Sequence, residues 1–172
     1  MTKFNQNDKK YMMYALELAQ KGAEQGEVPV GAVLVQFDEA GNAAVIGRGF
    51  NQPIAKHDPT SHAEILALRD ACRNLNNYRL PENTSLYVTL EPCTMCVGAL
   101  IHARLNRLVF ATREPRAGMV GSQANLLAQD FYNHNIKVQS GLYADESAQI
   151  LQDFFRKRRN MKKTQLKNNS KH

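Results

Sequence analysis

The stretch SLYVTLEPCTMC, residues 85–96, decides the fold class of this chain. Residues 85–90 are rich in β-branched, aromatic and leucine side chains and predict a strand. Pro92 suits the first turn of a helix that runs to about residue 102, and a second strand is predicted at residues 107–112. Because a helical crossover joins parallel strands, this unit predicts a parallel pair with a helix packed on its sheet.

Helix and strand signals alternate along the rest of the chain, without an internal repeat or a long linker. Apolar residues recur with a helical period over residues 11–19, and strands at residues 30–37 and 43–49 predict a hairpin. The order predicts one α/β domain, a three-layer α/β/α sandwich whose mixed central sheet has about five strands, with helices on both faces. The remaining predicted elements are a helix at about residues 61–76, an exposed loop at residues 113–123, a strand near residues 136–140 and a helix from about residue 144.

Length and composition bound the class of protein. A chain of 172 residues can bury its own core as one domain, and three cysteines are too few and too odd in number for a disulfide framework. Residues 1–8 are polar, and no stretch approaches the roughly 18 apolar residues of a membrane span. We therefore expect a cytoplasmic protein with no membrane partner.

The basic charge is concentrated at the C-terminus. The chain has a net charge of +6 from 22 Lys and Arg against 16 Asp and Glu, and residues 156–172 hold eight of the basic residues and no acid. The remainder, 14 basic against 16 acidic residues, has a formal charge of −2. We therefore divide the chain into a domain of residues 1–155 and a basic extension of the last helix, residues 156–172. Such an extension suits the backbone phosphates of a nucleic acid, and a solvated, partly frayed tail is the alternative.

Two short motifs, HAE at residues 62–64 and PCTMC at residues 92–96, together offer metal ligands and a carboxylate. His62, Cys93 and Cys96 are three strong zinc ligands, whereas a closed structural zinc site needs four and a catalytic site keeps one position open for water. Each motif is predicted to open a helix, where unpaired N–H groups and the helix dipole favour the thiolate form of cysteine. The pattern predicts one catalytic Zn²⁺ per subunit.

Glu64 is not needed as a ligand and is suited to moving protons. From the first turn of a helix its carboxylate can reach a metal-bound water and pass a proton to a ring nitrogen or a departing amine. The alternative is a capping box with Ser61 as the N-cap and Glu64 at the third helical position. A thioredoxin-like redox pair of cysteines would leave His62 and Glu64 without a role. His57 lies just before this helix and is a candidate contact for a substrate phosphate.

These motifs carry a resemblance to a known family. EVPVGAV at residues 27–33, Asn51, HAE at residues 62–64 and TLEPCTMC at residues 89–96 resemble the cytidine deaminase-like superfamily and, more closely, the bacterial tRNA-specific adenosine deaminases. H-x-E with P-C-x-x-C is the general signature of zinc nucleobase deaminases. The resemblance covers nearly the whole chain and implies a hydrolase that converts the wobble adenosine of an arginine tRNA to inosine.

The resemblance also implies roles for individual residues. The three ligands would bind zinc, and Glu64 would move the proton while hydroxide attacks C6 of a flipped adenine. Asn51 would recognise the base, Val30 would pack near its ring, and the Ala63 N–H would lie near the oxygen on the reacting carbon. The resemblance further implies a homodimer whose RNA cleft uses both subunits, and no organic cofactor.

Two departures from the family pattern and two other functions stay open. The hairpin loop at residues 38–42 is longer than the family pattern, and Glu114 stands where an Asp is usual. Arg156, Arg158 and Arg159 are candidate contacts for the anticodon arm of a tRNA. A deaminase of a free base or nucleoside, of the guanine or cytosine type, would share the metal chemistry. A non-catalytic, zinc-stabilised RNA-binding module would share the ligands without turnover.

Overall fold

A five-stranded mixed sheet forms the centre of the protein in the computed structural model, which describes residues 3–169. The strands are β1 (Gly31–Phe37), β2 (Ala43–Phe50), β3 (Thr84–Leu90), β4 (Arg107–Thr112) and β5 (Lys137–Ser140). Their order across the sheet is β2-β1-β3-β4-β5, with β1 antiparallel to both β2 and β3, and with β3, β4 and β5 parallel. The mixed sheet predicted from the sequence is confirmed.

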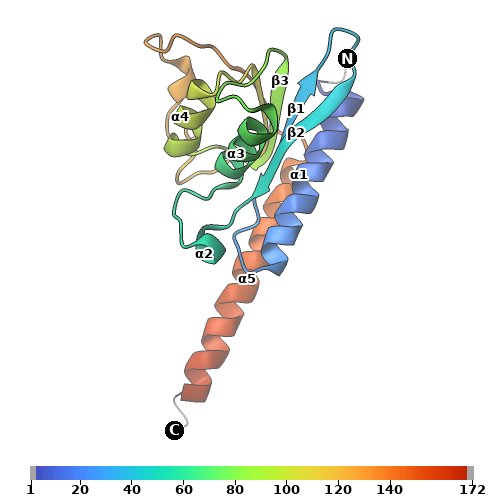
Figure 1. The fold of residues 1–172 in the computed structure, drawn as a ribbon. Helices are drawn as coiled ribbons and strands as arrows, with labels where there is room; N and C mark the ends of the chain where they lie inside the picture. Colours follow the sequence, from blue (N-terminus) through green and yellow to red (C-terminus); the bar gives the residue numbers. More distant parts are fainter. Residues whose placement is uncertain (1–2, 170–172) are drawn as a thin grey trace.

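Helices cover both faces of this sheet, which confirms the three-layer sandwich (Figure 1). They are α1 (Gln6–Glu24), α2 (Pro53–Lys56), α3 (Ala63–Leu75), α4 (Thr94–His102) and α5 (Ala144–Asn169), with a short 3-10 helix η1 (Leu126–Ala128). Helices α1 and α5 lie side by side on one face, and α3 and α4 pack together on the other. The C-terminal half of α5 extends beyond the sheet (Figure 1).

Both faces of the central strands are buried, so the core has two sides. In β1, Ala32 faces the α3 side and Val33 faces α1, and the alternation continues along the strand. A strand presents successive side chains to opposite faces, and both faces are apolar here because helices cover both. Gly31 opens β1 where α1 crosses it, and a Cβ there would lie 1.9 Å from the Ala15 carbonyl oxygen. Only a glycine lets the helix approach this closely.

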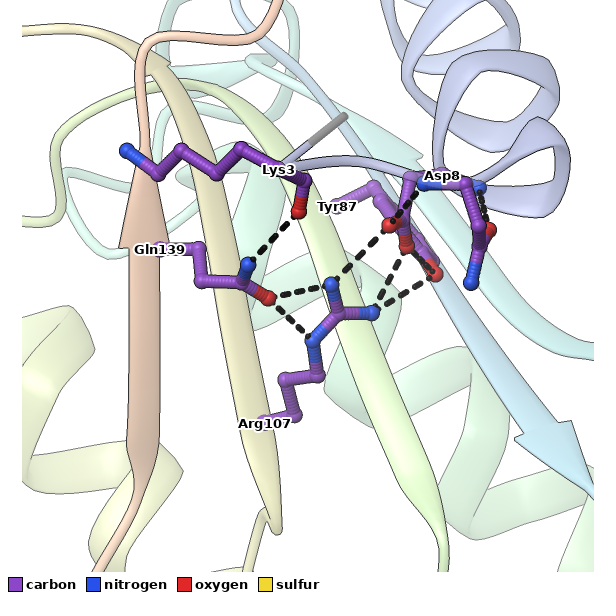
Figure 2. Close-up of polar contacts among 6 residues, drawn as sticks. Lys3, Asp8, Tyr87, Arg107 and Gln139 are labelled. Carbon is purple, nitrogen blue, oxygen red and sulfur yellow. Dashed lines mark hydrogen bonds and ion pairs between the residues drawn. The ribbon is translucent and has the colours of Figure 1, made fainter. Parts of the chain in front are cut away.

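A polar network lies at the end of the sheet where β4 begins (Figure 2). The carboxylate of Asp8 accepts hydrogen bonds from Nη1 of Arg107 at 2.7 Å and from the Tyr87 hydroxyl at 2.9 Å. Oε1 of Gln139 accepts a hydrogen bond from Nε of Arg107 at 2.8 Å, and Nε2 of Gln139 donates to the Lys3 carbonyl at 3.1 Å. The network therefore joins the N-terminal segment and α1 to β3, β4 and β5.

The helix starts next to the motifs differ from the predicted ones. The capping box considered as the alternative role for Ser61 and Glu64 is absent, because His62 is the N-cap of α3 and no side chain caps that end. The Ser61 hydroxyl donates to Asp58 at 2.8 Å instead. Helix α4 likewise begins directly after Cys93, later than its proline suggests. Glu64 therefore has no capping role.

Two peripheral segments are the loop that follows β4 and the C-terminal part of α5. The loop at residues 113–123 is only partly exposed, because Gly118 and Val120 are buried. The described part of the predicted extension, residues 156–169, continues α5 as one helix, and residues 170–172 lie outside the described residues. Among residues 3–169, no helix combines the length and the apolar character that crossing a membrane requires.

Candidate active site and metal centre

Two helix starts bring the predicted metal ligands together where β3 ends. His62 is the N-cap of α3, Cys93 is the N-cap of α4, and Cys96 lies in the first turn of α4. The Nδ1 atom of His62 lies 3.7 Å from each of the two sulfurs, and the three ligand atoms all lie within 4.8 Å of one another. Because α4 follows β3 and contacts α3, residues some thirty positions apart share one small site.

The donor set and its spacing fit a zinc ion. A tetrahedral ion about 2.3 Å from sulfur and about 2.0 Å from nitrogen holds these atoms about 3.5 Å apart, close to the observed separations. Within residues 3–169, the group of His, Cys, Asp and Glu ligand atoms close enough to share an ion consists of His62, Cys93 and Cys96. Three protein ligands leave the fourth tetrahedral position to water or substrate.

The two thiols of the group are electrostatically unequal. A hydrogen bond from Cys96 lowers the pKa of Cys93 to about 4, and the same bond, together with burial, raises the pKa of Cys96. Hydrogen bonding to Cys93 raises the pKa of His62. The lowered pKa favours the thiolate form of Cys93, and a thiolate is the form of cysteine that binds metal.

Glu64 lies in the first turn of α3 beside these ligands, with only 4% of its surface exposed. Burial raises the pKa of Glu64 to about 7. A carboxyl group with such a pKa is populated in both protonation states near neutral pH, so it can accept a proton and release it again. A buried, perturbed carboxyl beside a metal-ligand group is a candidate for acid and base catalysis.

A small cavity of about 120 Å³ opens over these side chains. Its walls include Val30 and Asn51 together with His62, Glu64 and Cys93. The cavity therefore brings together two of the three metal ligands, the carboxyl group and the two residues for which the family resemblance implies contact with the base. Val30 is buried and contributes an apolar wall, which suits the face of an aromatic ring.

Asn51 is oriented by a backbone hydrogen bond. Its Oδ1 accepts from the Ala63 N–H, at the start of α3, at 2.8 Å. Because the oxygen side of the amide faces this donor, Nδ2 is the group that can donate to a ligand. The family resemblance implies that the Ala63 N–H lies near the oxygen on the reacting carbon. Because this N–H already donates to Asn51, that role of Ala63 stays a prediction.

A larger basic groove of about 670 Å³ lies next to the cavity, between α5 and the loop that follows β4. Its basic wall residues are Arg113, Arg116, Arg156 and Arg159. The groove and the cavity share the wall residues Val28, Leu90 and Glu114. A polymer bound in the groove is therefore placed to present one of its units to the cavity.

The other two predicted RNA contacts lie outside this groove. The guanidinium of Arg158 lies 5.5 Å from the centre of the Phe154 ring, and Arg158 lines a separate hollow with Lys162. His57 is exposed at the C-terminal end of α2 and lines neither the groove nor the cavity. Of the three arginines predicted in α5, the groove thus contains two.

Sequence reasoning assigned no role to Glu91, which is buried at the wall of the cavity. The sequence signal that could have found it is an acidic residue directly after a buried strand. A buried charge is costly unless it is paired or hydrogen-bonded, so such a residue is expected to have specific partners. Arg113 and Arg116 were also missed as groove residues. They belong to a loop whose path depends on contacts with distant parts of the chain.

Comparisons with known proteins agree with this geometry. A family model described as MafB19-like deaminase matches residues 6–159. A tRNA-specific adenosine deaminase of Haemophilus influenzae is 52% identical over 156 residues, which are 91% of this chain and 87% of that protein. A solved structure from a study of A-to-I editing by tRNA:A34 deaminases at the wobble position of transfer RNA matches with a TM-score of 0.76 and 44% identity, over 83% of this chain and 99% of that chain. A guanine deaminase from Nitrosomonas europaea matches with a TM-score of 0.72 and 26% identity, over 85% and 83% of the two chains.

The three-layer fold, the His and Cys ligands and the buried carboxyl group together define a protein of the deaminase class, in agreement with the family match over residues 6–159. The 52% identity to a relative over most of both chains goes beyond a shared fold. The chain belongs to the family of tRNA-specific adenosine deaminases, as the sequence motifs indicate.

Proposed function

We propose that this protein is a zinc-dependent hydrolase that deaminates adenosine to inosine at the wobble position of a tRNA, with an arginine tRNA as its substrate. The observation that carries the proposal is a buried Glu64 beside three zinc-type ligands, at a cavity that shares walls with an arginine-lined groove. The identity to relatives named tRNA-specific adenosine deaminase supports the choice of substrate.

In this proposal His62, Cys93 and Cys96 hold one zinc ion per subunit. The ion would supply the Lewis acidity that makes water a nucleophile near neutral pH. Glu64 accepts one proton from the attacking water and passes it to a ring nitrogen of adenine. It then takes the remaining proton from the hydroxyl group added at C6 and passes it to the amino group, which leaves as ammonia. Burial of Glu64 suits both steps, because a carboxyl whose pKa lies at about 7 can both accept and release a proton near neutral pH.

Asn51 and Val30 hold the base in the proposed complex. Nδ2 of Asn51 donates to a ring nitrogen of the flipped adenine while Oδ1 stays bonded to the Ala63 N–H. Val30 offers an apolar face to the ring. The Ala63 N–H fixes the Asn51 amide, and a bifurcated bond, common at helix ends, would let it reach the oxygen on the reacting carbon.

The groove supports an RNA substrate because its four arginines, two from the loop after β4 and two from α5, can pair with phosphates. A wobble base flipped into the cavity would leave its neighbours in the anticodon arm beside the groove. We assign the chemistry to a catalytic domain, residues 1–155, and part of the RNA affinity to the extension, residues 156–172. Arg158 and His57 remain proposed contacts from outside the groove.

We also propose that the protein acts in the cytoplasm, as a homodimer whose RNA cleft uses both subunits, and without an organic cofactor. The support is the family relationship. Light scattering coupled to size-exclusion chromatography tests the dimer, since a mass of one chain at micromolar concentration would contradict it.

The direct test is to incubate the purified protein with a transcript of an arginine tRNA that carries adenosine at the wobble position, and to measure inosine. We expect conversion by the zinc-loaded protein, with none after removal of the metal. Glu64→Gln should keep the zinc content and the tRNA affinity while kcat falls by about 10²- to 10⁴-fold, the usual contribution of an acid and base catalyst. Undiminished inosine formation by Glu64→Gln would remove this residue from the mechanism.

A deaminase of free bases is the second candidate, because a guanine deaminase shares the fold at 26% identity. A free base has no phosphates to pair with the arginines of the groove, so the groove favours the RNA substrate. The discriminating measurement compares kcat/KM for the tRNA with that for guanine, adenosine and cytidine. A higher value for any free substrate would replace the first proposal with the second.

A further inference from the structure

We propose that Glu91 is a positioning residue that holds the loop of residues 113–122 in place and thereby sets the width of the RNA-binding groove. The inference rests on the proposed function, because it treats the arginines of this loop as RNA contacts. Glu91 lies between the end of β3 and the ligand Cys93, and only 2% of its surface is exposed.

Four hydrogen bonds from the loop converge on the Glu91 carboxylate. Its Oε1 accepts from the N–H groups of Val120 at 2.9 Å and Ser122 at 3.0 Å. Its Oε2 accepts from the Glu114 N–H at 3.1 Å and from the Ser122 hydroxyl. Hydrogen bonds to an ionised acceptor are stronger than neutral ones, and here one side chain fastens both ends of the loop.

The loop is built closely around this carboxylate. A Cβ at Gly118 would lie 2.4 Å from Cδ of Glu91 and 2.6 Å from the Glu114 carbonyl oxygen, so the turn has no room for a side chain. The Met119 N–H donates to the Pro92 carbonyl at 3.0 Å, which adds a backbone link just before the metal ligands of α4. The loop therefore packs directly against Glu91 and Pro92.

The held loop forms walls of both hollows. Glu114 lines the cavity and the groove, and Arg113 and Arg116 line the groove opposite the arginines of α5. Glu91 itself lines the cavity. If the loop moved, the distance between the two arginine pairs would change, whereas the metal ligands would stay on their helix starts. Loss of Glu91 is therefore expected to act on RNA binding more than on the chemical step.

The experiment replaces Glu91 by Gln, which has the same shape but only one acceptor oxygen. An NH2 group cannot accept from a backbone N–H, so the amide loses the Val120 and Ser122 N–H bonds in one orientation and the Glu114 N–H bond in the other. Hydrogen exchange of the amides of Glu114, Val120 and Ser122 should become about 10-fold faster or more. For an anticodon-arm RNA, KM should rise about 10-fold while kcat changes less than about threefold, with one zinc retained per chain.

Glu39→Gln is the matched control, because it makes the same charge change in the exposed hairpin loop and should alter none of these readouts. Ser122→Ala removes one of the four bonds and should raise KM by about threefold. It also serves as the test variant if Glu91→Gln does not fold.

Two results would overturn the proposal. One is unchanged hydrogen exchange of the loop amides in the Glu91→Gln protein. If Glu91→Gln does not fold, the same result in the Ser122→Ala protein would overturn the proposal. The other is loss of zinc with a lower kcat and an unchanged KM, which would place Glu91 at the metal instead of the loop. The exchange measurement needs no RNA. A wild-type protein that formed no inosine would therefore contradict the proposed function and leave the loop result standing.

Discussion

Removal of either partner of the Asp8–Arg107 ion pair should destabilise the fold, and the two removals should have unequal costs. Asp8 is 1% exposed, whereas 23% of the Arg107 side chain is accessible to water. Arg107→Met leaves a buried carboxylate without its cation. Asp8→Asn leaves a guanidinium that water can reach and that still contacts Gln139 (Figure 2).

The structure sets the size of the two effects. Breaking a buried ion pair by removing one partner costs about 3–5 kcal/mol. Arg107→Met removes two hydrogen bonds to Asp8, at 2.7 and 3.1 Å, and should cost about 4 kcal/mol. Asp8→Asn should cost about 2 kcal/mol, because water partly compensates the guanidinium and the amide keeps one acceptor. Leaving the Asp8 carboxylate without its cation should therefore lower the free energy of unfolding more than leaving the Arg107 guanidinium without its anion.

The dependence on pH gives a second measure of the same pair. Burial raises the pKa of Asp8, but hydrogen bonds from Arg107, the Asn5 N–H and Tyr87 outweigh it and leave the pKa below its ordinary value of 3.8. For a depressed carboxyl pKa, the stabilisation is present above the unfolded-state pKa and is lost as the pH falls through the folded-state value. The stability difference between wild type and Asp8→Asn should therefore shrink as the pH falls below about 4.

Urea unfolding at fixed protein concentration, at pH 7 and again at pH 3, measures these free energies. The exposed pair of Arg156 and Asp153 supplies the control, since Asp153→Asn should cost under about 0.5 kcal/mol. Two results would refute the reasoning from burial. One is an equal loss of unfolding free energy in Asp8→Asn and Arg107→Met, and the other is the same loss for Asp8→Asn at pH 7 and at pH 3.

Three further predictions test the site and the core. Asn51→Ala should raise KM for the tRNA and lower stability by about 1–2 kcal/mol, because the N–H at the start of α3 loses its acceptor. Asn51→Asp keeps that acceptor, so a thermal melt as low as that of Asn51→Ala would contradict this account. Gly31→Ala should lower the melting temperature by about 10 °C or more, because its Cβ would overlap a carbonyl of α1, and an unchanged melt would exclude that contact. Replacing Arg156 and Arg159 by Gln should weaken tRNA binding about 10-fold and reduce its salt slope by about two, measured by filter binding, while free-adenosine turnover stays constant. Arg158→Gln should have a smaller effect, and an equal or larger effect would move the RNA path away from the groove.

The features that sequence predicts well depend on spacing within one short segment. Composition predicts β4 at its observed bounds, residues 107–112. Cys93 and Cys96, three residues apart at a helix start, are predicted as neighbours and lie within reach of one ion. That His62 completes the group follows from ligand chemistry, because an incomplete zinc site needs a third donor from another helix.

The features that sequence did not predict depend on contacts between distant segments. Asp8 and Arg107 are 99 residues apart, and nothing local marks them as partners. The capping box at Ser61 and Glu64 fits the local pattern, but the bond from Ser61 to Asp58 competes with it and the helix starts later. Local patterns of this kind fit more than one geometry, and packing decides between them.

The polar side chains around the site act in one common way, by accepting backbone N–H groups from segments that have no strand partner. Asn51 accepts from Ala63, buried Glu27 accepts from Ala55 at 2.8 Å, and Glu91 accepts from the loop after β4. An irregular segment near a core needs such acceptors, because an unpaired buried N–H is costly. With the backbone held in this way, the exposed side chains of these segments can change without disturbing the metal ligands. Differences in substrate between deaminases that share this fold are therefore expected to lie in the loop side chains, and exchanging residues 113–117 between two such enzymes should alter substrate affinity while zinc content stays constant.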